Sequence, residues 1–280
     1  QKDFEDKLKE LSQIKFPKPV IIGTSKNFNE FFNYALEIAA LKRVKSTVDA
    51  IEGDAIAKKE LNGRLTAYQN LLFNSLYLNF ENADWTFNKN KVKENNLSAI
   101  ASLISNEVFK LTPIIHNELV VRDRLSGMSM NGATILLNRV FNNSNLKNLG
   151  MEGNPSEFGI YLSLIKSNNL HIKKGDEYVI SIDNTKNKSI KTIYDEFLKL
   201  IKGSKEAVNV SDIYAHFVKQ PYGIKIGLLP ILIGIFFKAT EASCAFYNKD
   251  EQGRESLITE FDQKVAERMY HMPETLKIMF

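Results

Sequence analysis

Apolar residues recur at intervals of three and four over the first third of the chain, which is the spacing of helices with one buried face. The pattern predicts a short helix over 2–14 and two long helices, over 27–45 and over 58–80. A brief extended segment is expected over 20–23, because prolines end the short helix just before it. The two long helices are expected to pack against each other as a hairpin.

The middle of the chain alternates polar turns with further helical patterns. Residues 88–96 combine charged and amide side chains with one apolar residue, which predicts a loop. Asn154, Pro155 and Glu157 predict a sharp helix start, because each suits its position at a helix N-terminus. The other helical patterns cover 97–111 and 117–137, the second with a break at 126–127.

After residue 170 the pattern changes to a strand, three helices and a hairpin. The expected elements are a strand over 177–182, helices over 190–201, 211–220 and 225–238, and paired strands over 243–248 and 257–261. Three helices followed by a hairpin is the order of a winged-helix module. The predicted fold is therefore mainly α, with a helical domain over 1–170 and a smaller, winged-helix-like α+β domain over 171–280.

The composition is that of an ordinary globular chain without an evident metal or thiol site. The 280 residues, 44% of them hydrophobic, are enough for two domains. The single cysteine, Cys244, lies in an apolar run and is expected to be a buried thiol. The four histidines are too far apart for a zinc-binding pair, so we expect no metal and no cofactor.

The two chain ends and the longest apolar run indicate where in the cell the protein is expected. The charged start has no secretory signal pattern, and the apolar run over 226–237 is too short to span a membrane, so we expect a cytoplasmic protein with no membrane partner. The missing initiator methionine and the apolar ending over 277–280 predict a fragment of a longer polypeptide.

The charge pattern argues against sequence-specific DNA recognition. A net charge of +4 is a mild excess that names no partner. The predicted third helix, 225–238, is apolar and has none of the Arg, Asn or Gln side chains that read base edges. Nonspecific phosphate contact stays open for the basic cluster of Lys186, Lys188 and Lys191.

The sequence contains no recognisable catalytic constellation. It lacks the G-x-x-x-x-G-K-[ST] loop that cradles phosphates, and residues 23–26 are more simply a strand-to-helix connection. The neighbouring carboxylates Asp195 and Glu196 have no His or Ser placed for a proton relay. We therefore predict no catalytic residue, and an enzyme would need a site assembled from scattered positions.

The segment NELVVRDR, residues 117–124, allows two interpretations. Glu118 and Arg122 lie four apart, as in a common ion pair on a helix surface, and Arg124 lies on the neighbouring face. Alternatively, Arg122 or Arg124 reaches a nucleotide site or a partner elsewhere. The sequence leaves both open.

Three segments in one order carry a resemblance to a known kind of protein. They are IHNELVVRDRLS at 115–126, LGMEGNPSEFGIYLSLIKSNNLH at 149–171, and VSDIYAHFVKQPYGIKIGLLPILIGIFF at 210–237. Together they resemble the region downstream of the ATPase core in large bacterial P-loop ATPases of BREX-type phage-defence systems. The resemblance covers roughly 97–280.

This resemblance implies a helical and winged-helix-like extension that works with an ATPase module. It implies that Asn117, Glu118, Arg122 and Asp123 mark an interdomain or regulatory surface, to which Arg124 belongs by position, and that 221–229 is a buried turn and helix. Since the Walker motifs are absent, any ATPase activity belongs to sequence outside this chain. We therefore expect a non-catalytic accessory region for coupling or assembly in defence against foreign DNA, with the remainder of the ATPase or its complex as partner.

Two other readings remain. A free-standing adaptor that binds nucleic acid or protein would show a basic groove along 173–191, whereas docking onto an absent domain would show an apolar face on the N-terminal helices. An enzyme would show a deep pocket in which Arg122, His116 and a carboxylate converge.

Overall fold

The computed structural model describes residues 7, 10, 11, 14, 16, 18–26, 28–48, 50–88, 90–94, 96–250 and 252–280. The chain forms two compact units, residues 1–108 and 109–280. The predicted helix over 2–14 and the residue at the predicted start of the next one, Asn27, lie largely outside the described residues.

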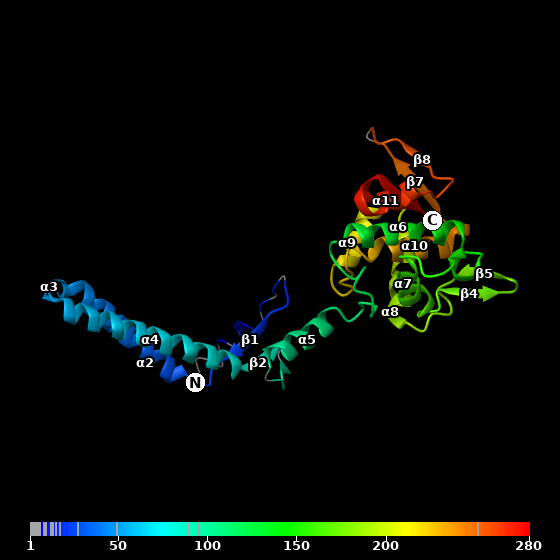
Figure 1. Cartoon of the computed structure of the whole chain (residues 1–280). Helices are drawn as coiled ribbons and strands as arrows, with labels where there is room; N and C mark the ends of the chain where they lie inside the picture. The colour runs from blue at the N-terminus through cyan, green and yellow to red at the C-terminus, as the bar shows by residue number, and fades with distance from the viewer. Residues whose placement is uncertain are drawn as a thin grey trace. The chain divides into compact units, whose positions relative to one another are not determined.

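The first unit is built on the predicted helical hairpin. Its elements are β1 Ile21–Thr24, α2 Phe28–Thr47, α3 Ala50–Gly53, α4 Ala55–Glu81, β2 Asp84–Phe87, β3 Asn90–Lys91 and α5 Leu97–Val108. Helices α2 and α4 lie side by side along their length (Figure 1). Asp54 begins α4 by accepting hydrogen bonds from the amides of Ile56 and Ala57. Both predicted long helices are confirmed, as is the extended segment that becomes β1.

A small sheet closes the base of this hairpin. β2 pairs antiparallel with both β1 and β3, and the predicted loop over 88–96 contains the turn and the short strand β3. Trp85 and Phe87 of β2 are buried with Ile100 of α5 in a core separate from that of the second unit. Gly23 has no room for a side chain, because a Cβ there would lie 2.5 Å from the Trp85 ring.

The second unit is mainly helical with two antiparallel sheets. Its helices are α6 Gly127–Asn142, α7 Phe158–Ile160, α8 Lys188–Lys202, α9 Val210–Val218, α10 Leu229–Thr240 and α11 Gln263–His271, together with a π-helical turn, η2 Tyr161–Lys166, and the short 3₁₀ turns η1 Lys147–Gly150, η3 Glu241–Ser243 and η4 Pro273–Thr275. Its strands are β4 His171–Lys174, β5 Glu177–Ile180, β6 Val208–Asn209, β7 Ala245–Lys249, β8 Glu255–Leu257 and β9 Leu276–Met279. The predicted helices of the C-terminal region are thus confirmed as α8, α9 and α10.

A single core spans the whole second unit. It contains α6 residues such as Leu136 and Leu137 together with nearly all of α10, from Leu229 to Phe237. Gly234 lets α6 and α10 approach closely, since a Cβ there would lie 2.4 Å from a methyl of Leu137. The division between units therefore lies between residues 108 and 109, and the expected boundary near residue 170 falls inside this core.

The main sheet has the strand order β6-β9-β7-β8. The predicted hairpin is present as β7 and β8, with Tyr247 opposite Leu257. Two elements, α11 and β9, were not predicted; β9 lies between β6 and β7 and buries Leu276 and Ile278. The predicted strand over 257–261 ends early, and Phe261 instead stacks on Phe141 of α6 with ring centroids 3.6 Å apart.

Two predicted helices differ from the structure. Residues 117–126 form turns and bends, so α6 begins only at Gly127, where the Ser126 hydroxyl accepts a hydrogen bond from the amide of Ser129. The helix expected to start at Asn154 begins at Phe158, after a turn in which the Pro155 carbonyl accepts from the Phe158 amide.

A buried histidine ties η2 to β4. The Nε2 of His171 lies 2.9 Å from the Ser144 carbonyl oxygen, which can only accept, so Nε2 is the donor. The Nδ1 then accepts from the Tyr161 hydroxyl at 3.1 Å. Burial lowers the pKa of His171, the carbonyl of Ser144 opposes that shift, and burial raises the pKa of Tyr161 to about 12.

This histidine predicts a loss of stability in mild acid. Because the folded-state pKa is below the unfolded value of about 6.5, the unfolded chain binds more protons as the pH falls through that value. The urea midpoint of the second unit is expected to be constant above this pH and to fall below it. In His171→Gln the fall should be smaller than in the parent, and an equal fall in both proteins would contradict the assignment.

Candidate partner surfaces

The segment 117–125 is a fixed loop that packs on Gly227. The Gly227 amide donates to the Arg122 carbonyl oxygen at 2.9 Å. A Cβ at Gly227 would lie 2.7 Å from that oxygen and 2.8 Å from the Val120 carbonyl oxygen. Glycine is therefore required here by close backbone approach, and the loop has one position on the second unit.

Side chains at both ends of the loop hold it in place. Asn117 donates to the Ser163 hydroxyl at 2.8 Å and accepts from the Leu119 amide at 2.9 Å. Asp123 accepts from Lys225 Nζ at 2.7 Å. Asn117 and Asp123 therefore position the loop on its own unit.

The two arginines differ in their contacts. Arg122 lies 3.8 Å from Glu118, so the predicted ion pair forms on a turn rather than on a helix, and both side chains are exposed. Arg124 is exposed and has no hydrogen-bond or ion-pair partner among the residues that the structure describes. The pair at Glu118 contributes little to stability at such exposure, whereas the Arg124 guanidinium is available to a ligand.

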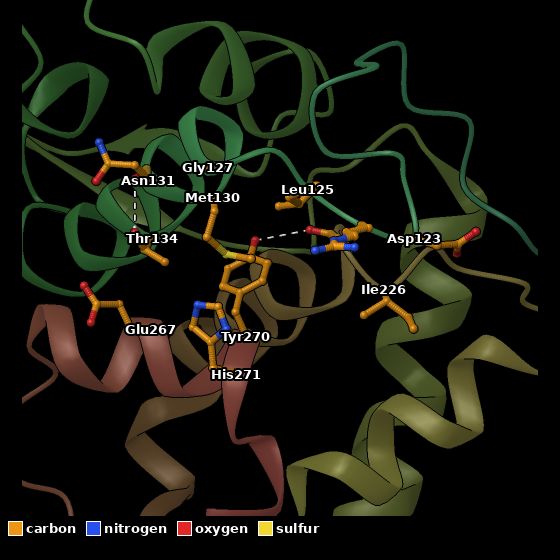
Figure 2. Close-up of a pocket in the computed structure, with 12 residues that line it drawn as sticks. Asp123, Leu125, Gly127, Met130, Asn131, Thr134, Ile226, Glu267, Tyr270 and His271 are labelled. Atoms are coloured by element: carbon orange, nitrogen blue, oxygen red, sulfur yellow. Dashed lines mark hydrogen bonds between the residues drawn. The ribbon is translucent and has the colours of Figure 1, made fainter.

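A pocket of about 600 Å³ lies beside Arg124. It is bounded by the loop, by α6, by the turn before α10 and by the end of α11 (Figure 2). Met130 and His271 point into the space beside the Tyr270 ring. The Tyr270 hydroxyl donates to the Gly227 carbonyl oxygen at 3.2 Å, and burial raises the pKa of this phenol.

A smaller hollow lies at the start of the loop. Its lining includes His116, Asn117, Glu118 and Arg122. The described residues thus bring together the His, Arg and carboxylate types that an enzyme reading requires. However, Glu118 and Arg122 are exposed and pair with each other, and Asn117 is bonded to Ser163, so no buried acid or base is present at this hollow.

The three lysines of the predicted nucleic-acid contact lie together at the start of α8. Lys186, Lys188 and Lys191 are all exposed. Asn187 caps the helix by accepting from the Ile190 amide at 3.2 Å. The lysines surround the positive end of the helix dipole, an arrangement that favours an anion nearby. These lysines lie in a different segment from the 117–125 loop.

An apolar stripe on α4 was missed by the sequence analysis. Phe73, Leu76, Tyr77 and Phe80 follow the i, i+3, i+4, i+7 spacing of one helix face, and each is more than half exposed. The apolar spacing of Leu61, Leu65, Tyr68, Leu72 and Leu76 predicts that Leu76 is buried, but the buried residues of α4 are Leu61 and Ser75, and Leu76 is 52% exposed. The available signal was the absence of any charged residue over 65–80.

The described residues contain no cluster of His, Cys, Asp and Glu that could hold a metal ion. Cys244 is half-buried, and burial raises the pKa of its thiol. In the connection over 23–26, which lacks the phosphate-binding pattern, Lys26 pairs with Asp84 at 3.3 Å. Among the described residues, no helix is long and apolar enough to cross a membrane.

Comparison of the chain with protein-family models, with curated proteins and with solved structures found no match.

Proposed function

We propose that this chain is a non-catalytic accessory region of a larger bacterial P-loop ATPase, and that it serves coupling or assembly in defence against foreign DNA. The observation that carries the proposal is the apolar stripe on α4, formed by Phe73, Leu76, Tyr77 and Phe80. Adjacent exposed aromatic and aliphatic side chains on one helix face are characteristic of a protein-docking surface.

The energetics favour a protein as the occupant of the stripe. Phe73 is 69% exposed, and full burial of such a side chain contributes about 1.5–3 kcal/mol. No residue from 65 to 80 is charged, so a partner helix can bury Phe73 and Leu76 without stranding an ion. The nearest charge on this face is Glu81 at the end of α4, whose side-chain hydrogen bond with Tyr77 raises the pKa of that phenol. Nucleic acid would instead require a row of lysines or arginines along the stripe.

The resemblance of 115–126, 149–171 and 210–237 to BREX-type proteins supports an ATPase module as the partner. In that case the helical hairpin contacts the module, while the second unit is carried beside it. On the second unit, the 117–125 loop with its exposed arginines is the interdomain or regulatory surface that the resemblance implies. The ATPase chemistry belongs to the partner.

We further infer that α8, β6, α9, α10, β7 and β8 form a winged-helix-like module. The order of three helices and a hairpin supports this assignment. Its third helix, α10, is buried from Leu229 to Phe237, so it has no face for a DNA groove. The module thus serves as a packing scaffold rather than as a reader of bases.

The test is binding between the purified chain and the BREX-type ATPase core of its source organism, measured by titration calorimetry. Phe73→Glu is expected to weaken binding at least tenfold, because it removes apolar burial of about 1.5 kcal/mol or more and adds an uncompensated charge. Ala67→Glu is the matched control, since Ala67 is exposed on α4 but outside the stripe. Equal binding by the two variants, or no binding by the parent, would overturn the proposal.

The alternative is a nucleic-acid adaptor, which the clustering of Lys186, Lys188 and Lys191 favours. A labelled DNA duplex titrated at several salt concentrations separates the two readings. Micromolar binding that falls steeply with salt and is lost in the triple Lys→Gln variant would support the adaptor. The accessory reading predicts no binding at low salt.

A further inference from the structure

The pocket beside Arg124 is more ordered than an ordinary surface depression. Three features fix its wall: the Gly227 amide bonded to the Arg122 carbonyl oxygen, the Asp123–Lys225 ion pair at 2.7 Å, and the Tyr270 hydroxyl bonded to Gly227. These contacts fix the backbone on both sides of Arg124, which lowers the cost of ordering the loop when a ligand binds.

One part of the pocket lining is apolar. Leu125, Met130 and Ile226 line it together with Tyr270, whose hydroxyl is already engaged and whose ring remains as a lining surface. The volume of about 600 Å³ is within the range of sites that hold small ligands. An aromatic or branched apolar group therefore fits the space, and the adaptable Met130 side chain suits such a guest.

The charged residues of the lining determine which polar group a ligand can carry beside its apolar body. Asp123 is neutralised by Lys225, whereas the side chains of Arg124 and His271 have no hydrogen-bond or ion-pair partner among the residues that the structure describes. A guanidinium in this position is suited to a carboxylate, which it can bind through two hydrogen bonds. The lining contains no lysine and includes Glu267, so a ligand with several negative charges, such as a nucleoside triphosphate, is disfavoured.

We propose that this pocket binds a monocarboxylate with an apolar body, its carboxylate on the Arg124 guanidinium and its apolar group against Met130 and Tyr270. This inference is independent of the docking role of α4. The carboxylate can come from a free small molecule or from the C-terminus of a peptide, and both have the same recognition chemistry.

The first arm of the test uses 3-phenylpropanoate as the probe and the methyl NMR signal of Met130 as the readout on the full chain. Saturable binding is expected with a Kd of about 1 mM or tighter, given the small size of the probe. The neutral 3-phenylpropanol, which has the same apolar body, should bind at least tenfold more weakly. Equal affinity for acid and alcohol, or no saturable shift of Met130, would overturn the proposal.

The second arm separates Arg124 from its neighbour. Arg124→Gln should lose at least tenfold in affinity for the acid and keep its affinity for the alcohol. Arg122→Gln is the matched control, because Arg122 lies outside the pocket lining and is also exposed. If both variants bind the acid like the parent, the assignment is wrong. Unchanged unfolding midpoints show that the variants fold.

The third arm identifies the source of the carboxylate. The tripeptide Gly-Gly-Phe, acetylated at its N-terminus, is compared with its C-terminal amide. Tighter binding than that of 3-phenylpropanoate, lost in the amide, assigns the pocket to the chain end of a partner protein. Weaker binding than that of 3-phenylpropanoate assigns it to a small molecule. Equal binding of the free acid and the amide would count against carboxylate recognition.

Discussion

Replacing Phe236 by alanine is expected to destabilise the second unit by about 3–5 kcal/mol, the cost of deleting a large, fully buried aromatic side chain. Phe236 is 0% exposed, and its ring centroid lies 5.4 Å from that of Tyr194 and 5.8 Å from that of Phe197. Because α8 and α10 share this contact and α10 also packs on α6, the loss of stability should extend to the whole second unit.

Hydrogen exchange of the α6 amides is the measurement for this variant. If residues 109–280 form one core, Phe236→Ala should speed exchange in α6 about as much as in α10. Leu257→Ala is the control, since Leu257 is 55% exposed on β8 and a surface substitution costs within about 0.5 kcal/mol. Unchanged α6 exchange would instead support a domain boundary near residue 170.

Replacing Arg139 by methionine is expected to cost about 3 kcal/mol, because it leaves the Glu157 carboxylate buried without its partner. Glu157 is only 3% exposed, and its Oε1 accepts from Arg139 Nε at 2.9 Å. This ion pair joins α6 to the turn before α7. Arg139 is itself partly exposed, so the expected cost is at the lower end for a broken buried pair.

A double-mutant cycle tests this pair. The urea midpoints of Arg139→Met, Glu157→Gln and the double variant are compared with that of the parent, and the double variant should recover much of the loss because no buried charge remains. Arg254→Met is the control, since its pair with Asp250 is at the surface and surface pairs contribute about 0–1 kcal/mol. Additive losses in the cycle would contradict the account.

Local patterning was sufficient to predict most of the longer helices, because α8 and α9 have one buried face and α10 is a continuous apolar run. It predicted α2, α4, α8, α9 and α10 close to their observed bounds. The domain boundary was beyond its reach, because the contact between Leu137 and Gly234 joins residues almost one hundred positions apart. Nothing in either segment alone specifies that contact.

The 117–125 loop shows why the spacing of charged residues is a weak guide to structure. Glu118 and Arg122 do pair, as their spacing suggested, but on a turn. In place of a helix, the Leu119 amide donates a hydrogen bond to the Asn117 side-chain oxygen, and Gly227 packs closely on the backbone of the loop. The pocket beside Arg124 could not be predicted, because it requires α6, α11 and the turn before α10 together.

The most direct test of the docking role is photo-crosslinking in the source cell, with a photoreactive phenylalanine analogue placed at position 73, 77 or 67. Positions 73 and 77 are on the α4 stripe, and position 67 is exposed outside it. The account predicts that the first two crosslink to a protein or domain that carries a P-loop, and that position 67 does not. Crosslinks only to a second copy of this chain, or the same products from all three positions, would contradict it.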